Sequence, residues 1–350
     1  MNLSPTAFGA LIGLVGVAAG ILVRDVAAPF LAWLNRSSTA RKEAVERYAQ
    51  PFATSVETMF WRLDEMLVKR RFSYLIRENR IRAFQVYKFE SSIYRIAALL
   101  GWIWALNEEH SLLLEKNSRK TDSFVSLAEL IAAALADGMH VEEWKVQQLC
   151  ELWRIDLPAE QALGAAGSDV EDILDAATFQ AGSRKALTEL DHQARFDLLA
   201  KVRARIERAS PRASLNRADL LTSSASALEI LGARQAWVFR DWQRAIGEVM
   251  TRRTTGNSAR LFDVIGFAEF SSLREAKNPW LLHLEEVIGD VDFDSSAPDF
   301  RRSQLEKLHG AVARTLVRLQ RLRLKQKCVS PNAAMAAKVT VQRYQQVIHA

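Results

Sequence analysis

The chain is poor in the residues that build disulfide-bonded, metal-binding or turn-rich proteins. Its 350 residues include 2 cysteines, 15 glycines and 8 prolines. Cys150 and Cys328 lie far apart in the sequence and have neither the spacing of a metal site nor that of a disulfide framework, which fits a cytosolic compartment. Since Ala, Leu, Arg and Glu dominate, the composition favours helix.

Signatures of the common enzyme classes are also lacking. The sequence contains no phosphate loop of type G-x-x-x-x-G-K-[ST], no H-E-x-x-H zinc pair, no G-x-S-x-G elbow and no strand-linked G-x-G-x-x-G. The six histidines are scattered, and none pairs with another at ligand spacing. We therefore expect no metal or cofactor and assign no catalytic residue, while a membrane-tethered enzyme with a motif-less active site stays as an alternative because catalytic groups can converge from distant positions.

Charge is absent from the first 23 residues, and residues 6–23 are almost wholly apolar. At about 1.5 Å per residue this stretch would span about 27 Å as a helix, close to the thickness of a hydrocarbon core of about 30 Å. A cleaved signal peptide would normally open with positive charge, and a helix buried in a soluble core would need neighbours on every side. We therefore predict a transmembrane helix, with an interfacial segment that completes the anchor at residues 1–35.

The flanking charges predict the orientation of this span. Lys and Arg residues follow it from Arg24 onward and none precedes it. Because positive flanks stay on the cytoplasmic side, the N-terminus should lie outside and the body in the cytoplasm. Four glycines (Gly9, Gly13, Gly16 and Gly20) fall on one stripe of the helix, where small residues allow two membrane helices to approach closely. The stripe predicts self-association, although glycine is also simply common in membrane helices.

Beyond the span the hydrophobic period is helical nearly everywhere. The apolar run Ile96–Leu106 is too short for a second span and predicts a buried helix at the centre of the body. The predicted fold class is all-α, with one N-terminal transmembrane helix followed by a cytosolic multi-helix bundle. A turn-rich stretch at 157–168 separates juxtamembrane and central helices (36–157) from a C-terminal helical region (158–350), and a single bundle is the equal alternative.

The net charge of +6 is concentrated in one segment. Between residues 301 and 327 there are nine Lys or Arg and one acid, with a packing face on one side and a basic stripe (Arg314, Arg318, Arg321 and Lys325) beside it. The stripe could contact anionic lipid, an acidic protein partner or nucleic acid, or could be a solvated face of a bundle helix. We favour the membrane surface because the body is already tethered there. Nucleic acid is disfavoured since no aromatic residues are interleaved for stacking on bases.

The string FRDWQRAIGEVM at residues 239–250 is the most distinctive local pattern. Its helical period places Val238, Trp242, Ile246 and Val249 on one face, and Arg240, Arg244 and Glu248 on another. The spacing predicts a contact between Arg244 and Glu248. The three polar residues form either the ion-paired flank of a core helix or a patch that binds a partner or ligand.

Three segments together resemble a family of uncharacterised bacterial proteins. These are LLGW at 99–102, WQRAIGEVM at 242–250 and IGFAEF at 265–270. The family has an N-terminal membrane segment, an aliphatic run leading to Gly-Trp and a string similar to WRxEQRAIGE(L/M)M. The chain departs from that pattern at Asp241 and Val249. The resemblance covers about residues 1–325 and implies a helical protein anchored in the bacterial inner membrane, with no activity or catalytic residues to carry over.

The sequence as a whole predicts a membrane-anchored cytosolic scaffold, sensor or interaction module. The enzyme described above is the first alternative. Binding of nucleic acid or anionic lipid through the basic segment at 301–327 is the second.

Overall fold

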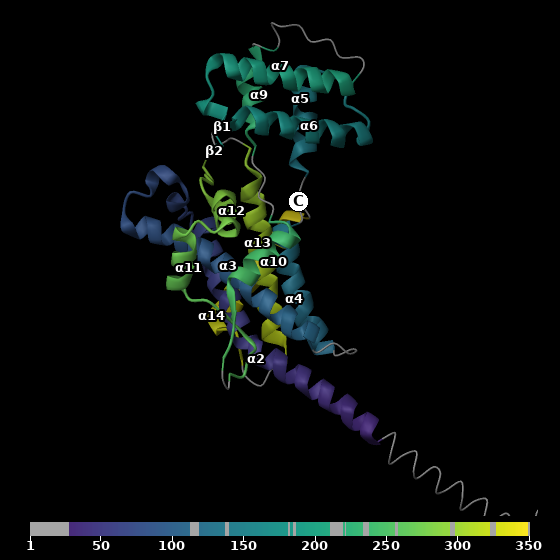
Figure 1. Cartoon of the computed structure of the whole chain (residues 1–350), viewed down its shortest axis with the longest axis vertical. Helices are drawn as coiled ribbons and strands as arrows, with labels where there is room; N and C mark the ends of the chain where they lie inside the picture. Colours follow the sequence, from purple (N-terminus) through teal and green to yellow (C-terminus); the bar gives the residue numbers. More distant parts are fainter. Residues whose placement is uncertain are drawn as a thin grey trace, which may run out of the picture.

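The protein is described by a computed structural model in which the fold is almost entirely helical (Figure 1). The described residues are 28–112, 119–136, 140–180, 183–184, 187–210, 220, 222–233, 238–255, 258–294, 298–322 and 327–348. The all-α prediction is confirmed at this level. The predicted span at 6–23, its four glycines and Lys325 lie outside the described residues. Among the residues that are described, no helix combines the length and the apolar character needed to cross a bilayer.

The helices follow one another with short connections. They are α2 (Ala28–Leu67), α3 (Ala83–Leu112), α4 (Arg119–Ala136), α5 (Val141–Trp153), α6 (Glu160–Thr178), α7 (His192–Ala209), α9 (Ser224–Leu231), α10 (Arg240–Val249), α11 (Phe267–Glu275), α12 (Pro279–Ile288), α13 (Phe300–Arg321) and α14 (Pro331–Ile348). Two short antiparallel strand pairs are interspersed: β1 (Phe179–Gln180) with β2 (Ser183–Arg184), and β3 (Thr251–Arg253) with β4 (Phe262–Val264).

The larger hydrophobic core lies around α2, α3 and α13, with α4, α10, α11, α12 and α14 packed about them. The run Ile96–Leu106 lies inside α3, and most of its side chains are buried, which confirms the predicted central helix. A helix that is apolar around its whole circumference is stable in water only when neighbours cover every side. This requirement explains why α3 is surrounded by other elements (Figure 1).

Helix α2 continues through Pro51 without a break. Proline removes one intrahelical hydrogen bond and usually ends or kinks a helix. Here Tyr48 and Phe52, on either side of it, are at most 1% exposed and belong to the larger core. Burial of two aromatic side chains, each contributing roughly 1.5–3 kcal/mol, offsets the bond that Pro51 lacks.

A second hydrophobic cluster is formed by α5, α6, α7 and α9, seen at the top of Figure 1. The sequence reading of 157–168 as a turn-rich joint is wrong for most of that stretch, because α6 begins at Glu160. Its glycines serve packing: a Cβ on Gly167 would lie 3.0 Å from the backbone of Glu142, so the residue allows α5 and α6 to approach closely. The division of the chain at 157 stays a prediction.

Candidate functional site

The two segments LLGW and WQRAIGEVM meet where α3 crosses α10. A Cβ added to Gly247 on α10 would lie 2.6 Å from the Cβ of Trp104 and 2.9 Å from the carbonyl oxygen of Leu100. A Cβ added to Gly101 on α3 would lie 3.1 Å from the Cβ of Met250 and 3.0 Å from a methyl carbon of Val264. Each helix therefore contributes the glycine that admits the other. We call this crossing the α3–α10 seam.

The third segment, IGFAEF, closes the same seam. The backbone N–H of Ile265 donates to the carbonyl of Met250 at 2.9 Å, and the Tyr94 hydroxyl donates to the carbonyl of Ile265 at 3.1 Å. The Tyr94 ring also packs edge-on against Phe267 and Phe270, with centroids 5.4 Å apart in both pairs. Segments that are far apart in the sequence are thus joined around one helix crossing.

Gln243, inside the WQRAIGEVM string, holds the end of a third helix to the seam. Its buried side-chain amide donates to the carbonyls of Ala132 at 2.9 Å and Val238 at 2.7 Å. The backbone N–H of Val238 in turn donates to the carbonyl of Leu135 at 3.0 Å. The last turn of α4 is therefore fastened to α10 by polar groups, because the final carbonyls of a helix have no partner within the helix.

The three polar residues of the string point outward from α10, but they pair differently from the sequence prediction. Arg240 binds Glu129 on α4 through two hydrogen bonds of 2.6 and 3.0 Å. Arg244 pairs with Glu108 on α3 at 3.4 Å, and Glu248 is exposed. The predicted contact between Arg244 and Glu248 is replaced by contacts to neighbouring helices, since those carboxylates lie within reach at the seam.

An aromatic group lies where α10 meets α12. Trp242 stacks on His283 with ring centroids 3.3 Å apart, and its indole N–H donates to the carbonyl of Trp280 at 3.3 Å. Trp280 and Phe239 are 40% and 60% exposed, so this edge of the seam presents aromatic surface to solvent.

Comparison with known proteins adds no family or fold assignment. No protein-family model, curated protein or solved structure matches the chain. The bacterial family suggested by the three strings therefore stays a prediction. In the structure, the glycines and the glutamine of those strings meet demands of close packing and helix capping, and these demands account for their spacing.

The basic stripe on α13 is partly described. Arg314, Arg318 and Arg321 are exposed, while the opposite face of α13 is buried in the larger core. Arg301, at the start of the same helix, is only 3% exposed and has a different role. Its guanidinium binds Asp299 and donates to the carbonyls of Gly289 and Asp290, closing the loop between α12 and α13.

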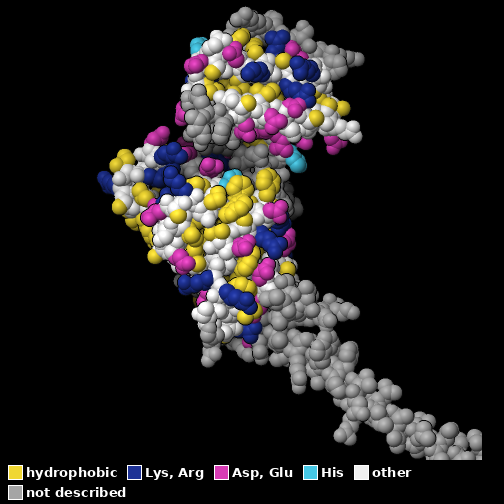
Figure 2. Space-filling view, viewed as in Figure 1, with side chains coloured by type: hydrophobic (Ala, Val, Ile, Leu, Met, Phe, Trp, Pro, Cys, Tyr) yellow, Lys and Arg dark blue, Asp and Glu magenta, His cyan; other side chains and the backbone are white. Residues whose placement is uncertain are grey.

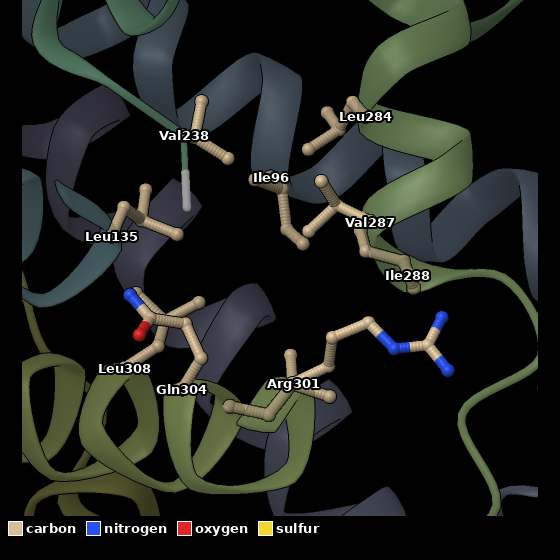
Figure 3. A pocket seen from close by; sticks show the side chains of 10 residues that line it. Ile96, Leu135, Val238, Leu284, Val287, Ile288, Arg301, Gln304 and Leu308 are labelled. Carbon is tan, nitrogen blue, oxygen red and sulfur yellow. The ribbon is translucent and has the colours of Figure 1, made fainter. Parts of the chain in front are cut away.

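A small cavity lies beside Arg301 and Gln304 (Figure 3). Its walls are mainly aliphatic side chains from α3, α4, α12 and α13, and it holds about one water molecule. The side chain of Arg301 extends away from it in Figure 3. The cavity is therefore too small and too apolar to receive an organic substrate. Within the described residues, no group of three or more His, Cys, Asp or Glu could hold a metal ion.

Two buried titratable groups were not indicated by any sequence pattern. His309 on α13 is fully buried, and its Nδ1 lies 3.2 Å from the hydroxyl of Tyr344. Its Nε2 has no hydrogen-bond partner among the described residues, and burial lowers the pKa of the imidazole to about 4. The ring is therefore neutral at physiological pH. His309 lies in the packing between α2, α13 and α14, so its position is structural.

Glu109, near the end of α3, joins three elements. Its carboxylate accepts from Arg47 of α2 at 2.7 Å and from the backbone N–H of Leu261 at 3.3 Å. The neighbouring Tyr48 hydroxyl accepts from the backbone N–H of Phe262 at 3.1 Å. Burial, with added repulsion from Glu109, keeps the pKa of Tyr48 well above its usual value, so that hydroxyl stays neutral. These contacts fasten the β3–β4 hairpin to α2 and α3.

Proposed function

We propose that this protein is a single-pass membrane protein whose helical body is a cytosolic scaffold, sensor or interaction module. The observation that carries the proposal is α2. It begins at Ala28, directly after the predicted span, and its second half, from Tyr48 to Met66, lies in the larger core. One continuous helix therefore connects the predicted anchor to the middle of the body, so a displacement of the span would be transmitted to the core.

The packing of the body supports a binding role. The seam is held by glycines, a buried amide and backbone hydrogen bonds, while its outward side presents arginines, carboxylates and aromatic rings. Rigid helices with such a surface suit recognition of another macromolecule, because little side-chain order is lost on binding. Exposed Tyr, Trp and Arg side chains are also the types that dominate binding energy at protein interfaces.

The anchor is tested by placing charge in the predicted span. Leu14→Arg with Val15→Arg should move the full-length protein from the membrane to the soluble fraction, since each arginine at a helix centre costs about 2.5–3.5 kcal/mol. The control, Leu14→Ile with Val15→Ile, should stay in the membrane. A wild-type chain that is extracted by alkaline carbonate would contradict the anchor. Periplasmic labelling of a cysteine placed at residue 2 tests the outside position of the N-terminus.

Self-association through the glycine stripe has its own test. Gly13→Ile with Gly16→Ile should weaken crosslinking between full-length chains in the membrane, because the bulky side chains prevent close approach. Leu11→Ile with Leu14→Ile changes the span without changing the stripe and should crosslink as the wild type does. Equal crosslinking of all three proteins would refute this part of the proposal.

Contact with anionic lipid through α13 is a second candidate, favoured by the exposure of Arg314, Arg318 and Arg321. Each well-placed arginine contributes about 1 kcal/mol at an anionic surface. The triple change to glutamine should reduce salt-sensitive binding of the chain lacking residues 1–35 to vesicles containing phosphatidylglycerol. Equal binding to neutral vesicles would reject this role.

A further inference from the structure

The connection between α2 and α3 projects from the body and carries unusual surface. It is the violet-blue segment at the left of Figure 1, and yellow and dark blue side chains lie together there in Figure 2. Ile81, Phe84 and Tyr87 are 87%, 67% and 49% exposed, and they recur at intervals of three residues. Exposed large hydrophobics that occur singly need no explanation, whereas a row of three marks an interaction site. We call residues 69–88 the basic protrusion.

The basic protrusion also has strongly one-sided charge. It contains seven Lys or Arg and one acid, Glu78. Among the seven, Arg71, Arg77 and Arg82 are exposed. Apolar side chains surrounded by positive charge favour a partner that is acidic and also offers some apolar surface.

Contacts at its base hold the basic protrusion in place. Arg62, which is 2% exposed, donates to Ser91 at 2.9 Å and to Tyr74 at 3.4 Å. The backbone N–H of Arg77 donates to the Asp290 carboxylate at 2.6 Å, and the N–H of Asp290 donates to the carbonyl of Leu75 at 2.8 Å. The segment is therefore fixed on both sides, so its exposed residues are presented in a defined arrangement.

A surface of the opposite charge lies on the second cluster of the same chain. Residues 140–178, which include α5 and α6, contain nine Asp or Glu and two Lys or Arg. The exposed acids are Glu151, Asp156, Glu160, Asp172 and Asp175. Leu157 is 56% exposed among them, and the small residues Ala165 and Ser168 are exposed on α6 between the carboxylates. We call this surface the acidic face.

The position of the basic protrusion argues against the membrane as its partner. It follows the far end of α2, and 40 helical residues correspond to about 60 Å. A bilayer that holds the predicted span would lie at the opposite end of that helix. Nucleic acid would satisfy the arginines, but its phosphates offer nothing to Ile81, the most exposed of the three apolar residues. A protein surface with carboxylates around an apolar residue matches both properties.

We propose that the basic protrusion of one copy docks on the acidic face of a second copy of this chain. Arg77 and Arg82 face the carboxylates of α6, and Ile81 and Phe84 cover Leu157 and the small residues beside it. This contact uses residues outside the predicted span, so it is independent of the glycine stripe. The partner copy completes an apolar surface that each copy alone leaves in water.

A charge-swap experiment tests the contact. Full-length protein in a neutral detergent carries Gly13→Ile and Gly16→Ile throughout, which removes any association through the span. Arg77→Glu with Arg82→Glu should weaken self-association, measured by sedimentation velocity, by at least about tenfold, because like charges then face each other. Glu160→Arg with Asp172→Arg should have the same effect. Combining all four changes should restore association to within about threefold of the starting protein.

The control reverses charge elsewhere. Lys201→Glu with Arg208→Glu changes two exposed residues of α7 by the same amount and should leave association unchanged. Association that persists in both charge-reversed variants would overturn the proposal. Failure of the four-fold variant to recover would overturn it as well, since a misfolded variant would show altered circular dichroism and a merely unmatched one would not. Loss of the membrane anchor in the separate fractionation experiment would leave this result unaffected.

Crosslinking places the contact on the chain. Carbodiimide joins lysine amines to carboxylates, and Lys69 lies in the basic protrusion. In an equal mixture of ¹⁴N- and ¹⁵N-labelled protein, peptides joining residues 69–88 to residues 151–175 should occur as mixed-isotope pairs. Same-isotope pairs alone would place the contact within one chain and refute a second copy. Phosphatidylglycerol vesicles that bind the starting protein but not Arg77→Glu/Arg82→Glu, with self-association unchanged, would assign the basic protrusion to lipid instead.

Discussion

Replacing Gly247 by alanine tests the α3–α10 seam most directly. In an unconstrained helix this change is favourable, because alanine has a helix propensity about 1 kcal/mol better than glycine. At the seam the new Cβ would meet the Cβ of Trp104 at 2.6 Å and the carbonyl oxygen of Leu100 at 2.9 Å. Neither atom can rotate away, since one is backbone and the other is bonded directly to it.

The size of the effect follows from these distances. Carbon atoms pack best about 3.5–4.0 Å apart, so α3 and α10 would have to separate by about 1 Å. Overpacking of this kind costs about 1–3 kcal/mol, and the separation would also loosen the apolar contacts along the seam. After the gain in propensity is subtracted, we expect Gly247→Ala to lower the free energy of unfolding by about 1–2 kcal/mol.

The assay is urea unfolding followed by tryptophan fluorescence and circular dichroism. Gly266→Ala is the control, because a Cβ there meets nothing within 4 Å. Gly101→Ala should fall between the two, since the nearest atom to its Cβ, 3.0 Å away, is a methyl group of the Val264 side chain, which can shift. A Gly247→Ala protein that is as stable as the wild type, or more stable, would refute the close crossing of α3 and α10.

Three further predictions concern side chains around the same body. His309 has a pKa of about 4 in the folded protein against about 6.5 when unfolded, so the unfolded chain binds more protons in that interval and stability falls as the pH drops; between pH 7 and pH 5 the loss should be about 2 kcal/mol, measured by urea unfolding, and His309→Leu should lose this dependence. Gln243→Leu should destabilise by about 1–3 kcal/mol, because it leaves the carbonyls of Ala132 and Val238 without their donor, whereas Gln320→Leu at an exposed position of α13 should change stability by less than about 0.5 kcal/mol. Arg244→Ala should cost less than about 0.5 kcal/mol, since its pair with Glu108 is solvent-exposed, and a larger loss would show that this pair is more than a surface contact.

The elements with the strongest local signal were predictable from the sequence. The apolar run Ile96–Leu106 predicted a central helix because no other environment accommodates such a segment in water, and α3 is that helix. The stretch at 157–168 was misread, because Gly and Ala are common both in loops and at close helix contacts. Only the position of α5 against Gly167 distinguishes the two.

The candidate surfaces were harder to predict because they depend on chains of contacts. The spacing of Arg244 and Glu248 predicted a pair within α10, but Glu108 of α3 competes successfully for the arginine. Glu109 carries no sequence sign of its role, since its partners Arg47 and Leu261 come from distant segments. The basic protrusion depends on how α2 and α3 diverge, which no local pattern encodes.

The C-terminal end of α4 has a consequence for the order in which the body assembles. Its final carbonyls are satisfied by Gln243, by the N–H of Val238 and by Gln304, which donates to Ala134. All three donors come from segments made more than a hundred residues later in the chain. During synthesis the last turn of α4 must therefore remain frayed until α10 and α13 have emerged. We expect its amide hydrogens to become protected against exchange together with those of α10 and α13, as one cooperative unit.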